Sequence, residues 1–271
     1  MKTSASRRLV WWSLLAGLCA SILPGAACGA SAVYLKTGKS LSVDSIQWKD
    51  GNKEYQVVTT DGAVQMTIPL KDVDRLDVER PAEFDRADKL IAGGQTEAAI
   101  PMLESITAKY KMMVWDVRAR EALGRIYVQK KDSAKALAAL EPLFSTTVSA
   151  VVAPDARRLY WEALMAAGKT ADLQKQLDDT IASGRRDAAA AAQVMRGNMF
   201  RAAGKKDEAL SDYLRTVLFF EDAKDARPEA LFRAAEGLNE LGDARAQEYR
   251  KVLAQKYPES EFAKKTAGKT E

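Results

Sequence analysis

The sequence predicts a mainly α-helical protein, an α-solenoid of about five helical hairpins preceded by a small all-β module. Three observations predict this fold. Turn glycines recur at nearly fixed intervals over residues 81–262, and residues 33–80 alternate apolar and polar side chains between short turns. In addition, 47% of the 271 residues are hydrophobic, which is enough for one large or two modest domains.

The first 32 residues are typical of a signal peptide for export. Lys2, Arg7 and Arg8 form a positive start, residues 9–23 are apolar but too short for a comfortable membrane span, and Pro24 precedes small residues. We expect cleavage after Ala32. The protein is therefore expected in the periplasm or the outer-membrane-associated part of a bacterial cell envelope.

A second interpretation of this segment stays open. Residues 25–28 (GAAC) partly match the lipobox of bacterial lipoproteins, with Gly25 where an aliphatic residue is usual, so Cys28 is a candidate lipidation site. A membrane partner is expected only in that case. The other cysteine, Cys19, also lies in the leader, so no disulfide is expected in the exported chain.

Residues 33–80 are expected to form the β module. Strands are predicted over residues 33–36, 41–43, 54–60, 64–69 and 74–78, with Gly-containing turns between the first four. This order resembles the SH3-like and Sm-like small barrels. Sm relatives bind RNA, but the module has seven basic residues against eight acidic ones, and phosphate binding needs a basic surplus. No nucleic-acid partner is expected, and the module is assigned to a second contact or to an oligomer interface.

Five segments that align at a turn predict the helical hairpins. Their anchor residues recur at intervals of 37, 37, 36 and 37 residues, the mark of a solenoid: Ala99, Ala136, Leu173, Ala209 and Ala246. In the fourth segment Gly197 and Ala209 are small where the paired helices should come closest, and Gly204 supplies the turn.

These segments resemble the tetratricopeptide repeat. Residues 123–140 and 197–213 match its small, turn and large apolar positions, and residues 256–265 look like the ends of repeats in envelope proteins of this family. The resemblance covers about 185 residues. Several features depart from it: the period exceeds the family's usual ~34 residues, Trp161 and Leu173 stand where small residues are expected, Pro101 and Pro142 fall inside second helices, and the fifth turn is one residue short. Residues 263–271 are expected to form a polar C-terminal tail.

The resemblance implies a concave face, lined by the first helices, that holds a peptide or a partner protein. Arg158, Asn198 and Arg201 are expected to clamp a carboxylate or backbone, and Phe232 to act as an apolar anchor. Eight positions face this groove by register: Arg125, Arg158, Glu162, Asn198, Arg201, Phe232, Glu236 and Asn239.

No enzyme is predicted. Histidine is absent, which excludes Ser-His-Asp and Cys-His nucleophile systems and histidine-ligated metals, and no glycine-rich cofactor motif occurs. We therefore expect no catalytic residues, cofactor or metal. The leading expectation is a non-enzymatic scaffold or adaptor of the cell envelope. The alternative is a structural or assembly component of an outer-membrane or secretion complex, which lipidation of Cys28 would favour. An enzyme that uses carboxylates, lysine or serine is the third class.

Overall fold

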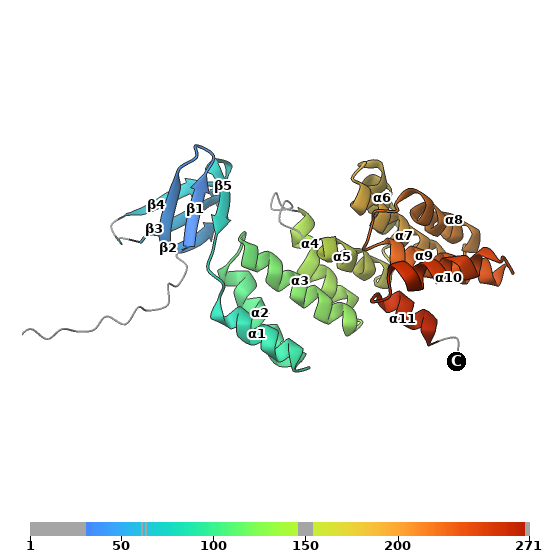
Figure 1. Ribbon diagram of the computed structural model, residues 1–271. Coiled ribbons are helices and arrows are strands. Elements are labelled where there is room, and N and C mark those ends of the chain that lie inside the picture. Colours follow the sequence, from blue (N-terminus) through green and yellow to red (C-terminus); the bar gives the residue numbers. More distant parts are fainter. Residues whose placement is uncertain (1–30, 61, 63, 146–153, 269–271) are drawn as a thin grey trace, which may run out of the picture.

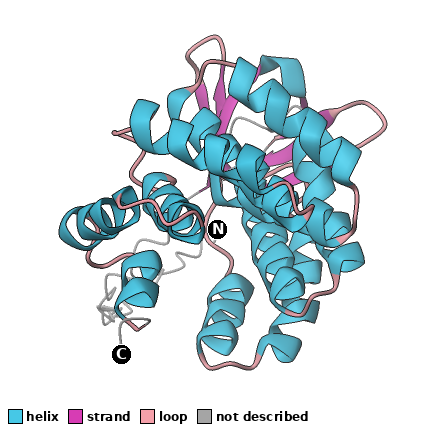
Figure 2. Ribbon diagram, turned by 90° about the vertical axis from the view of Figure 1, so that its right-hand side faces the viewer, coloured by secondary structure: helices cyan, strands magenta, loops and turns pink. Residues whose placement is uncertain are grey.

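The structure, a computed structural model, describes residues 31–60, 62, 64–145 and 154–268. Over these residues the chain is mainly helical, with one five-stranded antiparallel sheet at its N-terminal end, as the sequence predicts. The sheet lies at one end of the molecule and the helices extend away from it in chain order (Figure 1). Seen from the side of α8 (Lys206–Phe219) and α10 (Arg245–Lys256), the strands lie behind the helices (Figure 2). The expected signal peptide up to residue 30, including Cys28, lies outside the described residues.

The sheet has the strand order β4-β3-β2-β1-β5, so β4 and β5 are its edges. A short 3-10 turn, Leu70–Asp72, leads from β4 into β5. Alternate side chains of the strands point into a small core that includes Val33, Val57 and Ile68. The strands are β1 (Ser31–Leu35), β2 (Ser40–Lys49), β3 (Glu54–Thr59), β4 (Gln65–Pro69) and β5 (Val73–Asp77).

All five strands differ from their expected bounds, β3, β4 and β5 by no more than one residue at an end and β1 and β2 by more. β1 begins at Ser31, two residues before the expected start of the module, and the Ser31 hydroxyl accepts a hydrogen bond from the Glu79 amide at 3.1 Å. The sequence predicts that β2 ends at Val43, but the strand continues to Lys49. A register shift between Val43 and Ser45 explains the difference, because a bulge breaks the alternation that the sequence shows without ending the strand.

The β module is fixed to the turn between α2 (Thr96–Lys109) and α3 (Val114–Gln129). Met113 of this turn is 2% exposed and belongs to the core of the module. The Tyr55 hydroxyl donates to the Met112 carbonyl at 2.8 Å, and Lys111 Nζ lies 2.7 Å from an Asp50 carboxylate oxygen. Trp115 Nε1 donates to the Val78 carbonyl at 2.8 Å. The module and the first helices therefore share a core and polar contacts.

The helices follow one another as consecutive packed pairs, with a final short helix. They are α1 (Ala82–Ala92), α2 (Thr96–Lys109), α3 (Val114–Gln129), α4 (Ser133–Ser145), α5 (Pro154–Ala166), α6 (Thr170–Ala182), α7 (Arg186–Ala202), α8 (Lys206–Phe219), α9 (Arg227–Glu240), α10 (Arg245–Lys256) and α11 (Glu261–Ala267). Helices α3 and α5, α5 and α7, and α7 and α9 are also in contact. None of these helices is long and apolar enough to cross a membrane.

The turn within each pair has the same backbone geometry. One residue per turn has a positive φ, which favours glycine because a Cβ is crowded there. In the α7–α8 turn, the Gly204 and Lys205 amides donate to the Arg201 and Phe200 carbonyls, which closes the end of α7. The left-handed residues are 36 to 38 positions apart: Gly94, Lys131, Gly168, Gly204 and Gly242.

Paired helices approach closely where one of them carries glycine. A Cβ on Gly124 would lie 2.5 Å from Cδ2 of Leu140, and one on Gly197 would lie 2.5 Å from Cε1 of Tyr213. In the third pair the equivalent residue is Trp161, which is 1% exposed, and its Nε1 has no hydrogen-bond partner among the described residues. The Trp161 indole is part of the hydrophobic core, so this pair does not use the close helix approach that glycine allows in the second and fourth pairs.

A buried ionic network joins α6, α7 and α8. Asp212 is 1% exposed and accepts hydrogen bonds from Gln193, from Arg196 Nε at 2.8 Å and from Arg215 Nη1 at 2.9 Å. Arg196 also reaches Asp178 on α6 at 2.7 Å. These bonds compensate the cost of burying the Asp212 carboxylate.

The C-terminal residues differ from the expected polar tail. Residues 263–267 belong to α11, which begins after Ser260, whose hydroxyl accepts a hydrogen bond from the Ala263 amide at 3.1 Å. Ala263 is 8% exposed, and the Phe262 ring lies 5.7 Å from the Phe232 ring of α9. Because one face of this short segment is apolar, it folds back onto α9.

Candidate partner-binding groove

A groove with a volume of about 650 Å³ runs along α5, α7, α9 and α11. The first helices of the third, fourth and fifth pairs form its length, and α11 closes one side. Three of the eight residues expected at the concave face line it, namely Arg158, Glu162 and Asn198. The groove also receives residues from the loop between α8 and α9, including Lys224 and Asp225.

The apolar part of the groove comes mainly from α5 and α7. Met165 is 36% exposed, and Val194 and Met195 are more deeply buried beside it. Phe262 of α11 adds an aromatic surface to the lining. Together these side chains offer apolar area that a ligand could cover.

Six of the nine charged residues that line the groove form ion pairs with one another. Arg158 lies 3.7 Å from Glu162 on α5, and Lys265 lies 2.6 Å from Glu261 on α11. On α9, Arg233 lies 3.8 Å from Glu229 and 3.2 Å from Glu236, and it too lines the groove. The groove therefore presents an apolar strip flanked by three ion pairs and by charged residues of both signs, rather than a surface of one charge.

Glu162 is the titratable group of the groove with a shifted pKa. Burial raises the pKa of its carboxyl, because the charged form loses solvation. Arg158 lowers this pKa, whereas the carboxylates of Glu229 and Glu261 raise it further. Carboxylates of α9 and α11 thus influence the carboxyl of Glu162 on α5 across the groove.

Asn198 lies on α7 at the centre of a polar link. Its side-chain oxygen accepts a hydrogen bond from the Tyr213 hydroxyl at 2.8 Å, and its nitrogen donates to Glu229 at 3.0 Å. The amide therefore joins α7 to both α8 and α9. Both polar atoms of the Asn198 amide thus already have hydrogen-bond partners within the chain. To bind a ligand, the amide would have to share these partners with the ligand or give them up.

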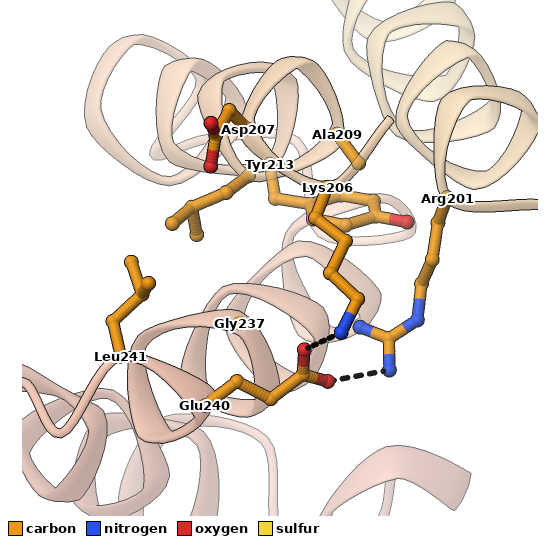
Figure 3. Close-up of a pocket in the computed structure, with 9 residues that line it drawn as sticks. Arg201, Lys206, Asp207, Ala209, Tyr213, Gly237, Glu240 and Leu241 are labelled. Carbon is orange, nitrogen blue, oxygen red and sulfur yellow. Dashed lines mark hydrogen bonds and ion pairs between the residues drawn. The ribbon is translucent and has the colours of Figure 1, made fainter. Parts of the chain in front are cut away.

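Arg201 lines a second, smaller pocket of about 140 Å³ between α7, α8 and α9. Figure 3 shows Arg201 and Lys206 reaching toward the carboxylate of Glu240, at distances of 3.3 and 2.9 Å. Lys206 is the larger cause of the lowered pKa of Glu240. The expected clamp at Arg201 is thus part of an internal ion-pair triad at the rim of this pocket.

Phe232 requires a correction. The sequence predicts an apolar anchor on the open concave face, but Phe232 is 7% exposed and packs against Phe262. The physical reason is that α11 covers this part of α9, so the ring already has an intramolecular partner. Phe262 presents the aromatic surface to the groove instead.

The remaining expected residues lie outside both pockets. Arg125 on α3 lies 3.8 Å from Asp155 at the start of α5, Glu236 pairs with Arg233, and Asn239 is exposed near the end of α9. Groove residues that the sequence reasoning missed come from the α5 start, from α7, from the α8–α9 loop with the start of α9, and from α11: Asp155, Met165, Ala191, Val194, Met195, Lys224, Asp225, Ala226, Pro228, Glu229, Arg233, Ser260, Glu261, Phe262 and Lys265. Met165 lies one helical turn after Glu162, and Glu229 lies one turn before Phe232. Both could therefore have been expected from the helical register of the predicted groove residues.

In the described part of the chain, no cluster of three or more acidic side chains could hold a metal ion. Comparisons with protein-family models, curated proteins and solved structures give no significant match to this chain.

Proposed function

We propose that the protein is an exported, non-enzymatic interaction scaffold of the bacterial cell envelope. In this proposal the helical pairs form a tetratricopeptide-like α-solenoid, and its concave groove holds a peptide or a partner protein. The repeated turn geometry at intervals of 36 to 38 residues supports the repeat assignment. The contacts between α3 and α5, α5 and α7, and α7 and α9 support a face lined by first helices.

The observation that carries the proposal is the groove itself. It has a volume of about 650 Å³, an apolar strip around Met165 and Phe262, and ion pairs along its sides. An amphipathic helix or an extended peptide fits such a surface, because its apolar side chains cover the strip and its polar ones meet the ion pairs. Catalysis would require reactive groups that converge on a substrate, whereas six charged residues of the groove are paired with one another.

The β module has a separate part in this proposal, as a second contact or an oligomerisation element. In the described part of the chain, the edge strands β4 and β5 each have one side that pairs with no other strand, and a further strand could add there. Because the module is anchored through Tyr55 and Met113, a partner bound there would be held in a fixed orientation to the first helices.

Site-specific photocrosslinking in the native envelope tests the groove. A photoreactive residue replaces Met165, which is 36% exposed in the groove, and a control variant carries it at Leu218, which is 62% exposed on α8 outside the groove. We expect one adduct from position 165 and none from position 218. The charge reversal Arg158→Glu should weaken that adduct, since it breaks the pair with Glu162 at the groove wall. Equal labelling at both positions, or an adduct insensitive to Arg158→Glu, would contradict the proposal.

A further inference from the structure

A shallow pocket of about 570 Å³ lies where the α8–α9 loop meets the end of α10. It is distinct from the groove, although Lys224 lines both. Arg227 is the first residue of α9, and Lys256 and Tyr257 stand at the end of α10. The lining residues are Glu221, Asp222, Lys224, Arg227, Lys256 and Tyr257.

The guanidinium of Arg227 is buried and only partly compensated, although its Nη1 also donates to the Glu221 carbonyl at 3.3 Å. Its side chain is 8% exposed, and its only ion-pair partner among the described residues is Glu221 at 2.9 Å, whose side chain is 70% exposed. Its buried Nε has no hydrogen-bond partner in the described structure. A buried cation that faces one solvent-screened carboxylate leaves a positive potential in the pocket.

The rest of the pocket adds to this positive charge. No carboxylate in the described ranges forms an ion pair with Lys224 or Lys256. The second acidic residue of the pocket, Asp222, is already bound by Arg186, with Nη2 at 2.7 Å and Nε at 3.2 Å. Three cationic side chains thus line the pocket beside Glu221, whose carboxylate is engaged only by Arg227 within the described part of the chain.

Tyr257 supplies a further hydrogen-bond donor, and the start of α9 adds a positive electrostatic potential. Arg227 Nη1 donates to the Tyr257 oxygen at 3.5 Å, which leaves the hydroxyl hydrogen free to donate to a ligand. The pocket also lies at the N-terminal end of α9, a helix of 14 residues, where the helix dipole is positive. Donors from the α8–α9 loop and from α10 therefore face the same concavity.

We propose that this pocket binds a phosphate group, with Lys224, Lys256 and Tyr257 as its direct donors and Arg227 as the buried charge behind them. Several donors on separate elements suit a group with at least three acceptor oxygens better than a carboxylate with two. This inference is independent of the groove's function and can hold or fail without it.

The first experiment is calorimetric titration of the full chain with inorganic phosphate at about pH 7.5 and low salt, where surface electrostatics are least screened. We expect saturable binding that Lys256→Gln weakens about fivefold, the usual size of one exposed ion pair. Tyr257→Phe should also weaken binding because it removes a donor and keeps the ring. The control is Lys251→Gln on the same helix, an exposed lysine that lines none of the described pockets, and it should leave binding unchanged.

A second arm distinguishes the source of the phosphate. Vesicles of phosphatidylglycerol replace inorganic phosphate in a sedimentation assay with the same variants. Binding to vesicles alone, weakened by Lys256→Gln, would assign the pocket to a lipid headgroup, and binding to inorganic phosphate would assign it to a soluble phosphate. Absence of binding in both arms would overturn the inference, and so would equal losses from Lys251→Gln and Lys256→Gln.

Discussion

The ring of Tyr213 packs so closely on Gly197 that a methyl group at Gly197 would stand 2.5 Å from Cε1 of the ring. Non-bonded carbon atoms normally lie about 3.5–4 Å apart, so this helix spacing is available only to glycine. The Tyr213 hydroxyl is at the same time bound to Asn198 at 2.8 Å, one residue along α7. The ring therefore cannot move away without breaking a polar contact.

Gly197→Ala should destabilise the protein by about 1–2 kcal/mol, since overpacking costs ~1–3 kcal/mol and alanine's helix preference offsets ~1 kcal/mol. Urea unfolding measures this change. The matched control is Gly237→Ala, whose new methyl would lie 3.1 Å from Cδ1 of Leu210, the mobile end of a side chain. It should leave stability unchanged or raise it. A similar loss in both variants would show that the Tyr213 contact is not the cause.

Lys131→Gly should stabilise the protein by about 1 kcal/mol. Lys131 is the one non-glycine residue among the five equivalent turn positions, with a φ of 59° that costs a side chain ~1–2 kcal/mol. The reverse change, Gly168→Ala, should cost about 1 kcal/mol for conformational reasons alone, because a Cβ added at Gly168 would meet no other atom within 4 Å. Thermal unfolding compares the two, and shifts of the same sign would refute the assignment.

Asp212→Ala should destabilise the protein by about 3–5 kcal/mol, because it leaves Arg196 without its buried partner. Asp178→Ala removes the other carboxylate on the same guanidinium, but its side chain is 46% exposed, so we expect a loss below about 1 kcal/mol. Chemical denaturation of both variants measures the difference. Equal effects would mean that burial of Asp212 contributes nothing to the network.

Stability should fall at alkaline pH because of Tyr55. Burial raises the pKa of Tyr55 to about 12, against ~10 in an unfolded chain. The folded state therefore favours the neutral phenol, and this stabilisation is fully present below about pH 10 and lost as the pH rises through about 12. We expect the free energy of unfolding to fall by about 2–3 kcal/mol more in the wild type than in Tyr55→Phe over this interval. Parallel pH curves for the two proteins would contradict this expectation.

Local features of the fold could be predicted from the sequence. The hairpin turns follow from glycines whose left-handed backbone and helix-closing hydrogen bonds involve only neighbouring residues. The α3–α4 turn, where Lys131 replaces glycine, can be found only through its spacing from the other turns. The end of β2 could not be predicted, because a bulge near Ser45 shifts the side-chain alternation on which strand prediction depends.

The candidate site was less predictable, because it depends on contacts between distant residues. Arg158 and Asn198 follow from helical register within their own helices. The burial of Phe232 depends on Phe262, thirty residues away in the sequence. No periodicity in the sequence predicts that contact. Partners such as Glu229 for Asn198 likewise appear only when α7 and α9 are placed side by side.

The attachment of the β module has a mechanical consequence. Only residues 78–81 join β5 to α1, and the turn before α3 inserts Met113 into the core of the module. A force applied to the sheet would therefore reach α3 directly, through the shared core and through the hydrogen bonds of Tyr55 and Trp115. It would not depend on the linker alone. A pull or twist on the sheet would therefore reach α1 and α3 together, through the linker and through the shared core.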